Sequence, residues 1–188
     1  VTRFRAAWEA ATAQHTILRT GFVQQGEGWL QWVAREAPLP FTLHDWSDRN
    51  DHTEALDTLA AHDLSQGFDL ARPPLQRVTL VRTAARRHHL IWTHHHVLMD
   101  GWSVSQLMGD VLRHYDGRAP MAAGGRYRDY IDWLAHRDAG ASETWWRGVL
   151  AELDEPTRLA TALGNADPQP GHGEHLLALD EAATTRLV

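Results

Sequence analysis

Residues 93–103 read Thr-His-His-His-Val-Leu-Met-Asp-Gly-Trp-Ser, and they join an apolar extended run to a segment with helical periodicity. Upstream, residues 88–97 are rich in branched and aromatic side chains, which predicts a strand. Asp100-Gly101 is a turn signal, and Ser103 suits the N-cap of a following helix. The stretch therefore predicts a strand, a tight turn and a helix start.

Three imidazoles at the end of this strand favour acid–base chemistry. Strand alternation places His94 and His96 on one face and His95 on the other. Histidine accepts a proton near neutral pH, and a strand end projects it from a rigid support. Asp100 can fold back to hold local backbone or an arginine. The N–H of Gly101 lies near a helix start that favours developing negative charge, as acyl transfer to an amine or hydroxyl requires.

Two other interpretations of the histidine triplet stay open at this point. His94 and His96 could begin a zinc site, but no third ligand is evident from the sequence, so we predict no metal. In a chain with 13 histidines, three adjacent ones could also carry no function. The Asp100-Gly101-Trp102-Ser103 continuation argues against that second interpretation.

Composition and net charge exclude or disfavour several classes of function. The 188 residues carry a net charge of -6 with histidine neutral, which disfavours nucleic-acid binding by phosphate neutralisation. Cysteine and lysine are both absent, so disulfides, thiolate chemistry and lysine Schiff bases are excluded. No apolar segment approaches the roughly 20 residues that span a bilayer. We expect a protein that binds no membrane and is cytoplasmic, forming one domain or part of a larger one.

Helical and extended patterns alternate along the chain without one strict βαβ period, which predicts a mixed α+β fold. The expected strands are 19–24, 29–34, 38–46, 75–82, 88–97 and 175–179. The expected helices include 2–14, one carrying Leu56 to Leu64, one carrying Val104 to Tyr115, two with aromatic stripes (Tyr127 to Leu134 and Trp145 to Leu153), and one from Glu181 onward. Residues 154–173 are expected to form a loop or linker.

The run His95-His96-x-x-x-Asp100-Gly101-Trp102-Ser103 resembles the signature of the condensation domains of nonribosomal peptide synthetases, members of the chloramphenicol-acetyltransferase-like superfamily. Further motifs agree in order and spacing. They are His15-x-x-Leu18-Arg19-Thr20-x-Phe22, Phe68-Asp69-Leu70-x-x-x-Pro74-Leu75 and Tyr127-Arg128-Asp129-Tyr130-x-x-Trp133. Together these motifs span almost the whole chain.

The resemblance implies a chloramphenicol-acetyltransferase-like lobe, with a central, mostly antiparallel or mixed sheet flanked by helices. Residues 1–188 are then expected to form the N-terminal lobe of a two-lobed domain. The family's first motif and the C-terminal lobe would be absent, and the 154–173 linker would lead towards that missing lobe.

The resemblance also implies amide-bond formation between a donor peptidyl or acyl thioester and an acceptor aminoacyl thioester. Both substrates would be carried on phosphopantetheine arms of upstream and downstream peptidyl carrier proteins, beside an adenylation domain, and the domain itself would bind no cofactor. An L-peptidyl donor with an L-aminoacyl acceptor is favoured, and the isolated chain is expected to be inactive. Epimerisation-type, ester-forming and non-catalytic carrier-docking members are the alternatives.

Residue roles carry over by position in the motifs. The resemblance makes His96 the catalytic histidine, with His95, Asp100 and Gly101 completing the catalytic set. Arg19 is expected to pair with Asp100 and so fix the loop. Trp102 is expected to pack under the turn, and Ser103 to cap the next helix.

Overall fold

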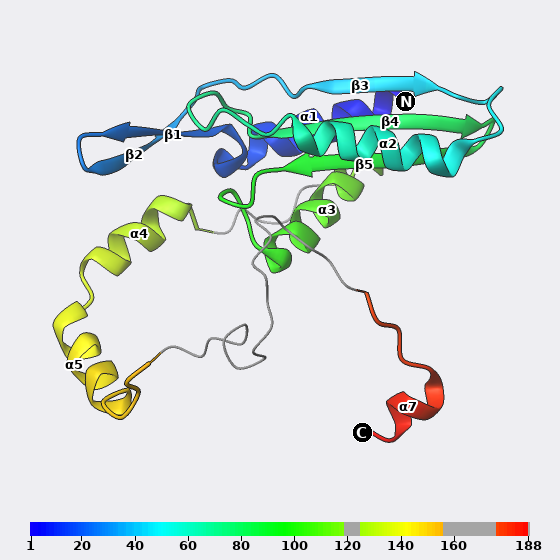
Figure 1. The fold of residues 1–188 in the computed structure, drawn as a ribbon. Coiled ribbons are helices and arrows are strands. Elements are labelled where there is room, and N and C mark those ends of the chain that lie inside the picture. The colour runs from blue at the N-terminus through cyan, green and yellow to red at the C-terminus, as the bar shows by residue number, and fades with distance from the viewer. Residues whose placement is uncertain (119–124, 156–175, 188) are drawn as a thin grey trace. The chain divides into compact units, whose positions relative to one another are not determined.

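The computed structural model describes residues 1–118, 125–155 and 176–187 (Figure 1). They form two compact units, 1–136 and 137–188, which are described separately. Most of the predicted 154–173 linker, from residue 156 onward, lies outside the described residues.

The first unit is built on a three-stranded sheet. Its strands β3 (Phe41–Asp45), β4 (Gln76–Ala84) and β5 (Arg87–His94) lie in that order. β3 pairs with β4 in parallel and β4 with β5 in antiparallel fashion, so the sheet is mixed, as predicted. A separate antiparallel hairpin joins β1 (Thr20–Gln25) to β2 (Gly28–Val33), and Gly26 in its turn has a φ of 61°.

Helices cover both faces of β4. The Gln76 amide donates to Thr12 Oγ1 of α1 (Thr2–Gln14) at 3.2 Å. The next residue, Arg77, donates to the Asp63 carboxylate of α2 (His52–Ser65) at 3.1 Å. Since neighbouring residues of a strand face opposite sides, α1 and α2 lie on opposite faces of the sheet, as Figure 1 shows.

The core lies between α1, the sheet and α3 (Gly101–Tyr115). Trp8 is fully buried, and its ring centroid lies 5.0 Å from that of Trp92 on β5. Leu98 and Met99, from the segment between β5 and α3, are buried in the same cluster. The core therefore includes two side chains of the signature stretch itself.

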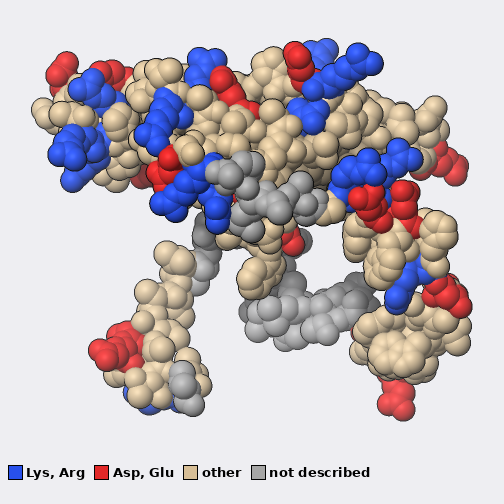
Figure 2. All heavy atoms as spheres, turned by 180° about the vertical axis from the view of Figure 1, so that it is seen from behind, with Lys and Arg blue, Asp and Glu red and all other residues tan. Residues whose placement is uncertain are grey.

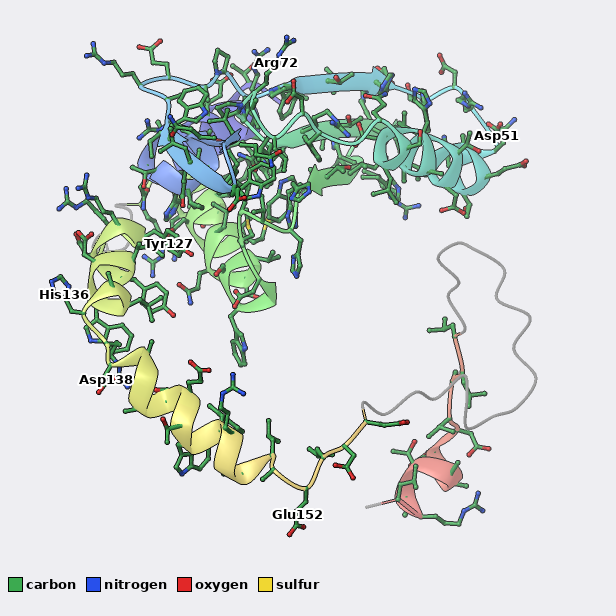
Figure 3. The ribbon with its side chains drawn as sticks, turned by 60° about the vertical axis from the view of Figure 1, so that its left-hand side comes forward. Asp51, Arg72, Tyr127, His136, Asp138 and Glu152 are labelled. Atoms are coloured by element: carbon green, nitrogen blue, oxygen red, sulfur yellow. The ribbon has the colours of Figure 1, made fainter. Side chains whose placement is uncertain are left out.

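The apolar stripes of α4 (Tyr127–Ala135) and α5 (Ala139–Val149), which as helix-spaced aromatic sets would most often be core, are exposed. Figure 3 marks Tyr127 at the start of α4 and Asp138 at the N-cap of α5, where the Asp138 carboxylate accepts from the backbone N–H of Ala141 at 2.9 Å. A stripe of this spacing predicts an amphipathic helix, but its burial depends on a partner that the described residues do not supply.

Smaller differences concern element limits and single side chains. The helix η1 (Thr16–Arg19) precedes β1, and α7 (Glu181–Thr185) lies in the second unit. The expected last strand is wrong, because residues 176–180 carry no strand. Leu64, which ends the predicted apolar series of this helix, is 71% exposed at the last turn of α2.

Candidate active site

The segment between β5 and α3 forms a turn that backbone hydrogen bonds of His95 and Leu98 hold in place. β5 ends at His94, and the N–H of His95 donates to Leu75 O at 2.9 Å. The N–H of Leu98 then donates back to His95 O at 3.1 Å and closes the turn. His96 therefore lies in the turn, and the prediction that it shares a strand face with His94 is wrong.

The His95 side chain stabilises the turn through a hydrogen bond to the backbone and a ring contact. Its Nδ1 accepts from the backbone N–H of Val97 at 3.1 Å, which leaves the ring hydrogen on Nε2 in the neutral form. The ring meets Phe68 edge-on, with centroids 6.5 Å apart, and the Arg77 guanidinium lies 4.2 Å from the Phe68 centroid. The geometry gives His95 a structural contribution to the loop that carries His96.

His94 packs against the sheet. Its ring lies 4.7 Å from that of Trp92, and burial lowers the pKa of His94, so the ring is neutral near pH 7. Within residues 1–118, 125–155 and 176–187, no group of three or more potential metal ligands is found.

His96 is exposed and lines a cavity of about 450 Å³. The polar groups around this cavity come from six positions besides His96: His15, Asp100, Ser103, Gln106, Asp110 and Tyr127. Leu98 and Leu107 contribute apolar surface. The ring is therefore open to a ligand, while Leu98, two residues on, is fixed in the core.

Asp100 is the N-cap of α3, a role that the sequence assigned to Ser103. Its carboxylate accepts from the backbone N–H of Ser103 at 2.9 Å and from the Ser103 hydroxyl at 2.7 Å. These two bonds, with a smaller effect of the His96 imidazole, hold the pKa of Asp100 below its usual value. The correction has a simple cause: the helix begins at Gly101, so Asp100 is the flanking residue with extended backbone and Ser103 is the third helical residue.

The expected pair between Arg19 and Asp100 is wrong in this structure. Arg19 donates from Nη1 to the backbone carbonyls of Ala34 and Arg35, the latter at 3.1 Å. Arg19 is the last residue of η1 and is followed directly by β1, so its side chain spans the base of the β1–β2 hairpin. Asp100 takes its hydrogen bonds from its own helix instead.

Trp102 does not pack under the turn, as was expected, but is 83% exposed. Val111 is fully buried nine residues later, and about 100° of rotation per residue places the two on opposite sides of α3. Gly101 begins the helix, and a Cβ built on it meets no atom within 4 Å. The main chain at the start of α3 is thus open to close approach.

One pair in the cavity was missed from the sequence. His15 Nε2 and Asp110 Oδ2 are 2.9 Å apart, and the Asp110 side chain is only 8% exposed. Its other carboxylate oxygen, Oδ1, is buried with no hydrogen-bond partner among the described residues. A signal was present: Asp110 is a charged residue inside the apolar stripe of α3, next to Val111 and three residues after Leu107.

A larger hollow, of about 570 Å³, adjoins η1 and the β1–β2 hairpin. Its lining includes Thr16, Gln31 and Val33, with Arg128 and Asp132 from α4. Among the described residues no histidine lines it, so of these two cavities the one beside His96 has the groups suited to proton transfer near neutral pH.

The sequence profile of the family described as "Condensation domain" matches residues 1–187. This chain belongs to the condensation-domain family. The resemblance drawn from the motifs is therefore confirmed.

The chain is similar to segments of several much longer synthases. It is 37% identical over 180 residues to chondramide synthase from Chondromyces crocatus, a match that covers 93% of the chain and 4% of the synthase. It is 33% identical over 181 residues to a surfactin synthase protein from Bacillus subtilis, a match that covers 92% of the chain and 5% of that protein. The chain thus spans only a few per cent of the length of these relatives.

Solved structures confirm the α+β fold class. The starter condensation domain of rhizomide synthetase superposes with a TM-score of 0.71 at 21% identity, covering 82% of this chain and 40% of that one. The SgcC5 protein from Streptomyces globisporus gives 0.68 at 21% identity, covering 79% and 36%. None of the helices in the described ranges is long and apolar enough to cross a membrane.

Proposed function

We propose that this chain carries the catalytic turn of a condensation domain that joins a donor acyl or peptidyl thioester to an acceptor aminoacyl thioester through an amide bond. The observation that carries the proposal is the open His96 ring on a turn fixed by buried Leu98 and Met99. A catalytic imidazole needs both properties, because it must reach the substrate and hold one position.

The proposed reaction has a definite proton balance. The acceptor amine attacks the thioester carbonyl carbon, a C–N bond forms, the C–S bond breaks, and the sulfur leaves as a thiol. One proton must move from the attacking nitrogen to the departing sulfur. We assign this transfer to His96, whose ring has no hydrogen-bonded protein partner in the described structure and so can serve the substrate. Gly101, at the open start of α3, is assigned to the developing oxyanion.

Supporting roles follow from the contacts. Asp100 holds the first turn of α3 to the signature segment, and His95 braces the turn against Phe68. Arg19 acts on the hairpin base rather than on Asp100. We assign no substrate contact to Trp102, Ser103 or Arg19.

Thioester substrates agree with one solved relative, because the rhizomide starter domain is described in complex with C8-CoA. We extend this to carrier-bound phosphopantetheine thioesters, with upstream and downstream carrier proteins and an adenylation domain as partners. On the face shown in Figure 2, arginine side chains are interspersed with acidic ones, so no single charged patch identifies a carrier site.

The chain covers about two fifths of the solved condensation domains, so we expect amide formation to require the complete domain. We propose that residues 1–188 belong to its N-terminal lobe and that the C-terminal lobe supplies the second wall of the substrate passage. The isolated chain is then inactive.

Identification of the product tests the proposed function. The complete domain is mixed with an acyl-loaded donor carrier and an aminoacyl-loaded acceptor carrier, and intact carriers are analysed by mass spectrometry. The proposal predicts transfer of the acyl group onto the acceptor amine, with release of the donor thiol. An ester product, inverted donor stereochemistry without transfer, or carrier binding with no transfer would each contradict it.

A further inference from the structure

We propose that His15, held by the buried Asp110 carboxylate, is a second catalytic base in the His96 cavity, and that it takes the proton of the acceptor ammonium before attack. The inference rests on the proposed function and deepens it. It assigns a proton acceptor to a step that precedes the bond-forming one.

The pair is built into the packing of two helices. His15 directly follows α1, and Asp110 lies on the face of α3 that packs against α1. The Asp110 side chain is 8% exposed, whereas His15 is 34% exposed and borders the cavity. The carboxylate is thus held inside the protein, and the imidazole forms part of the cavity wall.

The hydrogen bond at 2.9 Å sets the form of the ring. Asp110 offers only acceptor oxygens when ionised, so His15 Nε2 must carry the hydrogen that joins them. In the neutral ring, Nδ1 is then the basic nitrogen. An imidazole oriented by a carboxylate is the arrangement by which enzymes hold a general base in its active tautomer. In this cavity His15 has such a carboxylate, and His96 has no hydrogen-bonded partner among the described residues.

The chemistry requires two protons to leave the nitrogen. An α-ammonium group has a pKa of about 8, so the acceptor enters protonated near pH 7. It loses one proton to become a nucleophile and a second during amide formation. Only the second can be delivered to the leaving sulfur; the first must go to a base and then to water. The partial exposure of His15 provides that exchange with water.

A purely structural pair between the same helices is available for comparison. His114 Nε2 on α3 lies 2.8 Å from Gln14 Oε1 on α1, and His114 is outside the residues that line the cavity. This hydrogen bond joins α1 to α3, but it involves no carboxylate, and His114 does not line the cavity. If His15 served only to hold the helices together, replacement of either histidine would have the same kind of effect.

The ionisable groups around the proposed base come from three elements. The turn contributes His96 and Asp100, α3 contributes Asp110, and α4 contributes Tyr127. The cavity that His15 lines therefore holds two carboxylates, one other imidazole and one phenol. Any measured pH profile of the cavity belongs to this group of residues, so a variant that removes only the His15 base is needed.

His15→Gln is the decisive variant, because a glutamine amide can still donate to Asp110 but cannot take a proton at neutral pH. It is compared with Asp110→Asn and with the control His114→Gln in the complete domain, using loaded carriers under single turnover. At pH 6.5 we expect amide formation by His15→Gln to fall about 100-fold, the lower range for loss of a general base. At pH 9, where the acceptor is already a free amine, we expect a deficit below about fivefold.

The remaining variants separate the roles. Asp110→Asn should show a smaller loss with the same recovery at high pH, and His114→Gln should match the unaltered domain at every pH. Thermal unfolding of His15→Gln should stay close to that of the unaltered domain. A loss that is the same at all pH values, or no loss at all, would overturn the assignment of His15 while leaving the proposed function intact. Failure of the unaltered domain to form any amide would overturn both.

Discussion

Helices α3 and α4 carry apolar stripes of similar regularity, but only the stripe of α3 is packed. Leu107 and Val111 of α3 meet Trp8 and its neighbours on α1, whereas Tyr130 and Trp133 of α4 remain about half exposed. Periodicity therefore specifies a helix and its apolar side. Whether that side is buried depends on residues far away in the chain. For α3 those residues are on α1, within the described residues, whereas the described residues do not cover α4.

The largest difference in stability between the packed region around α3 and the exposed helix α4 should come from replacing Trp8. Trp8→Ala removes a fully buried indole between α1, α3 and β5, and we expect a loss of about 4 kcal/mol in the free energy of unfolding. Urea denaturation of the 188-residue chain measures it. Trp133→Ala on α4 is the matched change and should cost less than about 0.5 kcal/mol. Equal losses would contradict the contrast between the helices.

A second prediction concerns the network behind His95. Arg77→Ala leaves the Asp63 carboxylate, only 13% exposed, without its guanidinium, and should cost about 3 kcal/mol. It also removes the cation above Phe68, the ring that braces His95. The exposed pair Arg147–Glu143 on α5 is the control, since Arg147→Ala should change stability by less than about 0.5 kcal/mol.

The same pair predicts a pH dependence. Burial raises the pKa of Asp63, but the hydrogen bonds from Arg77 and Thr93 outweigh burial, and the pKa lies below its usual value. Its stabilising contribution is therefore present above the unfolded-state pKa of about 3.9 and is lost as the pH falls through the lower folded-state pKa. Denaturation of Arg77→Ala and the unaltered chain between pH 6 and pH 2 should show their stabilities converging. A constant difference would contradict this account.

The smallest effect is expected at the start of α3. Asp100→Asn keeps an oxygen that can accept from the Ser103 N–H, so α3 should remain capped and amide formation should fall by less than about tenfold. Asp100→Ala loses the cap and should slow amide formation further. Single-turnover assays of the complete domain compare them. A full loss in Asp100→Asn would show that the carboxylate charge, rather than the cap, is required.

Much of the fold could be predicted because its signals are local. The strand that ends near His94, the turn at Asp100-Gly101 and the helix after it follow from side-chain alternation and turn chemistry. Long-range placement could not be predicted in the same way. Whether Trp102 points inward depends on the rotation of α3 against α1, and the partner of Arg19 depends on where the β1–β2 hairpin lies. Only the assembled hairpin decides that Arg19 binds the carbonyls of Ala34 and Arg35.

In the site, too, local features could be predicted from the sequence and long-range contacts could not. The signature identified His96 and its turn, which the structure places at an open cavity. The contact between His15 and Asp110 joins residues 95 positions apart, and no spacing rule connects them. The charged residue within an apolar stripe indicated that Asp110 is buried, but not which side chain it meets.

The most direct test is the single-turnover rate of amide formation by the complete domain after His96→Ala. His89→Ala is the matched control, since His89 is an exposed histidine on β5, the strand that leads into the turn of His96. We expect His96→Ala to lose at least about 100-fold with unchanged thermal unfolding, while His89→Ala retains full activity. A His96→Ala domain that forms amide at the rate of the unaltered protein would contradict the central claim.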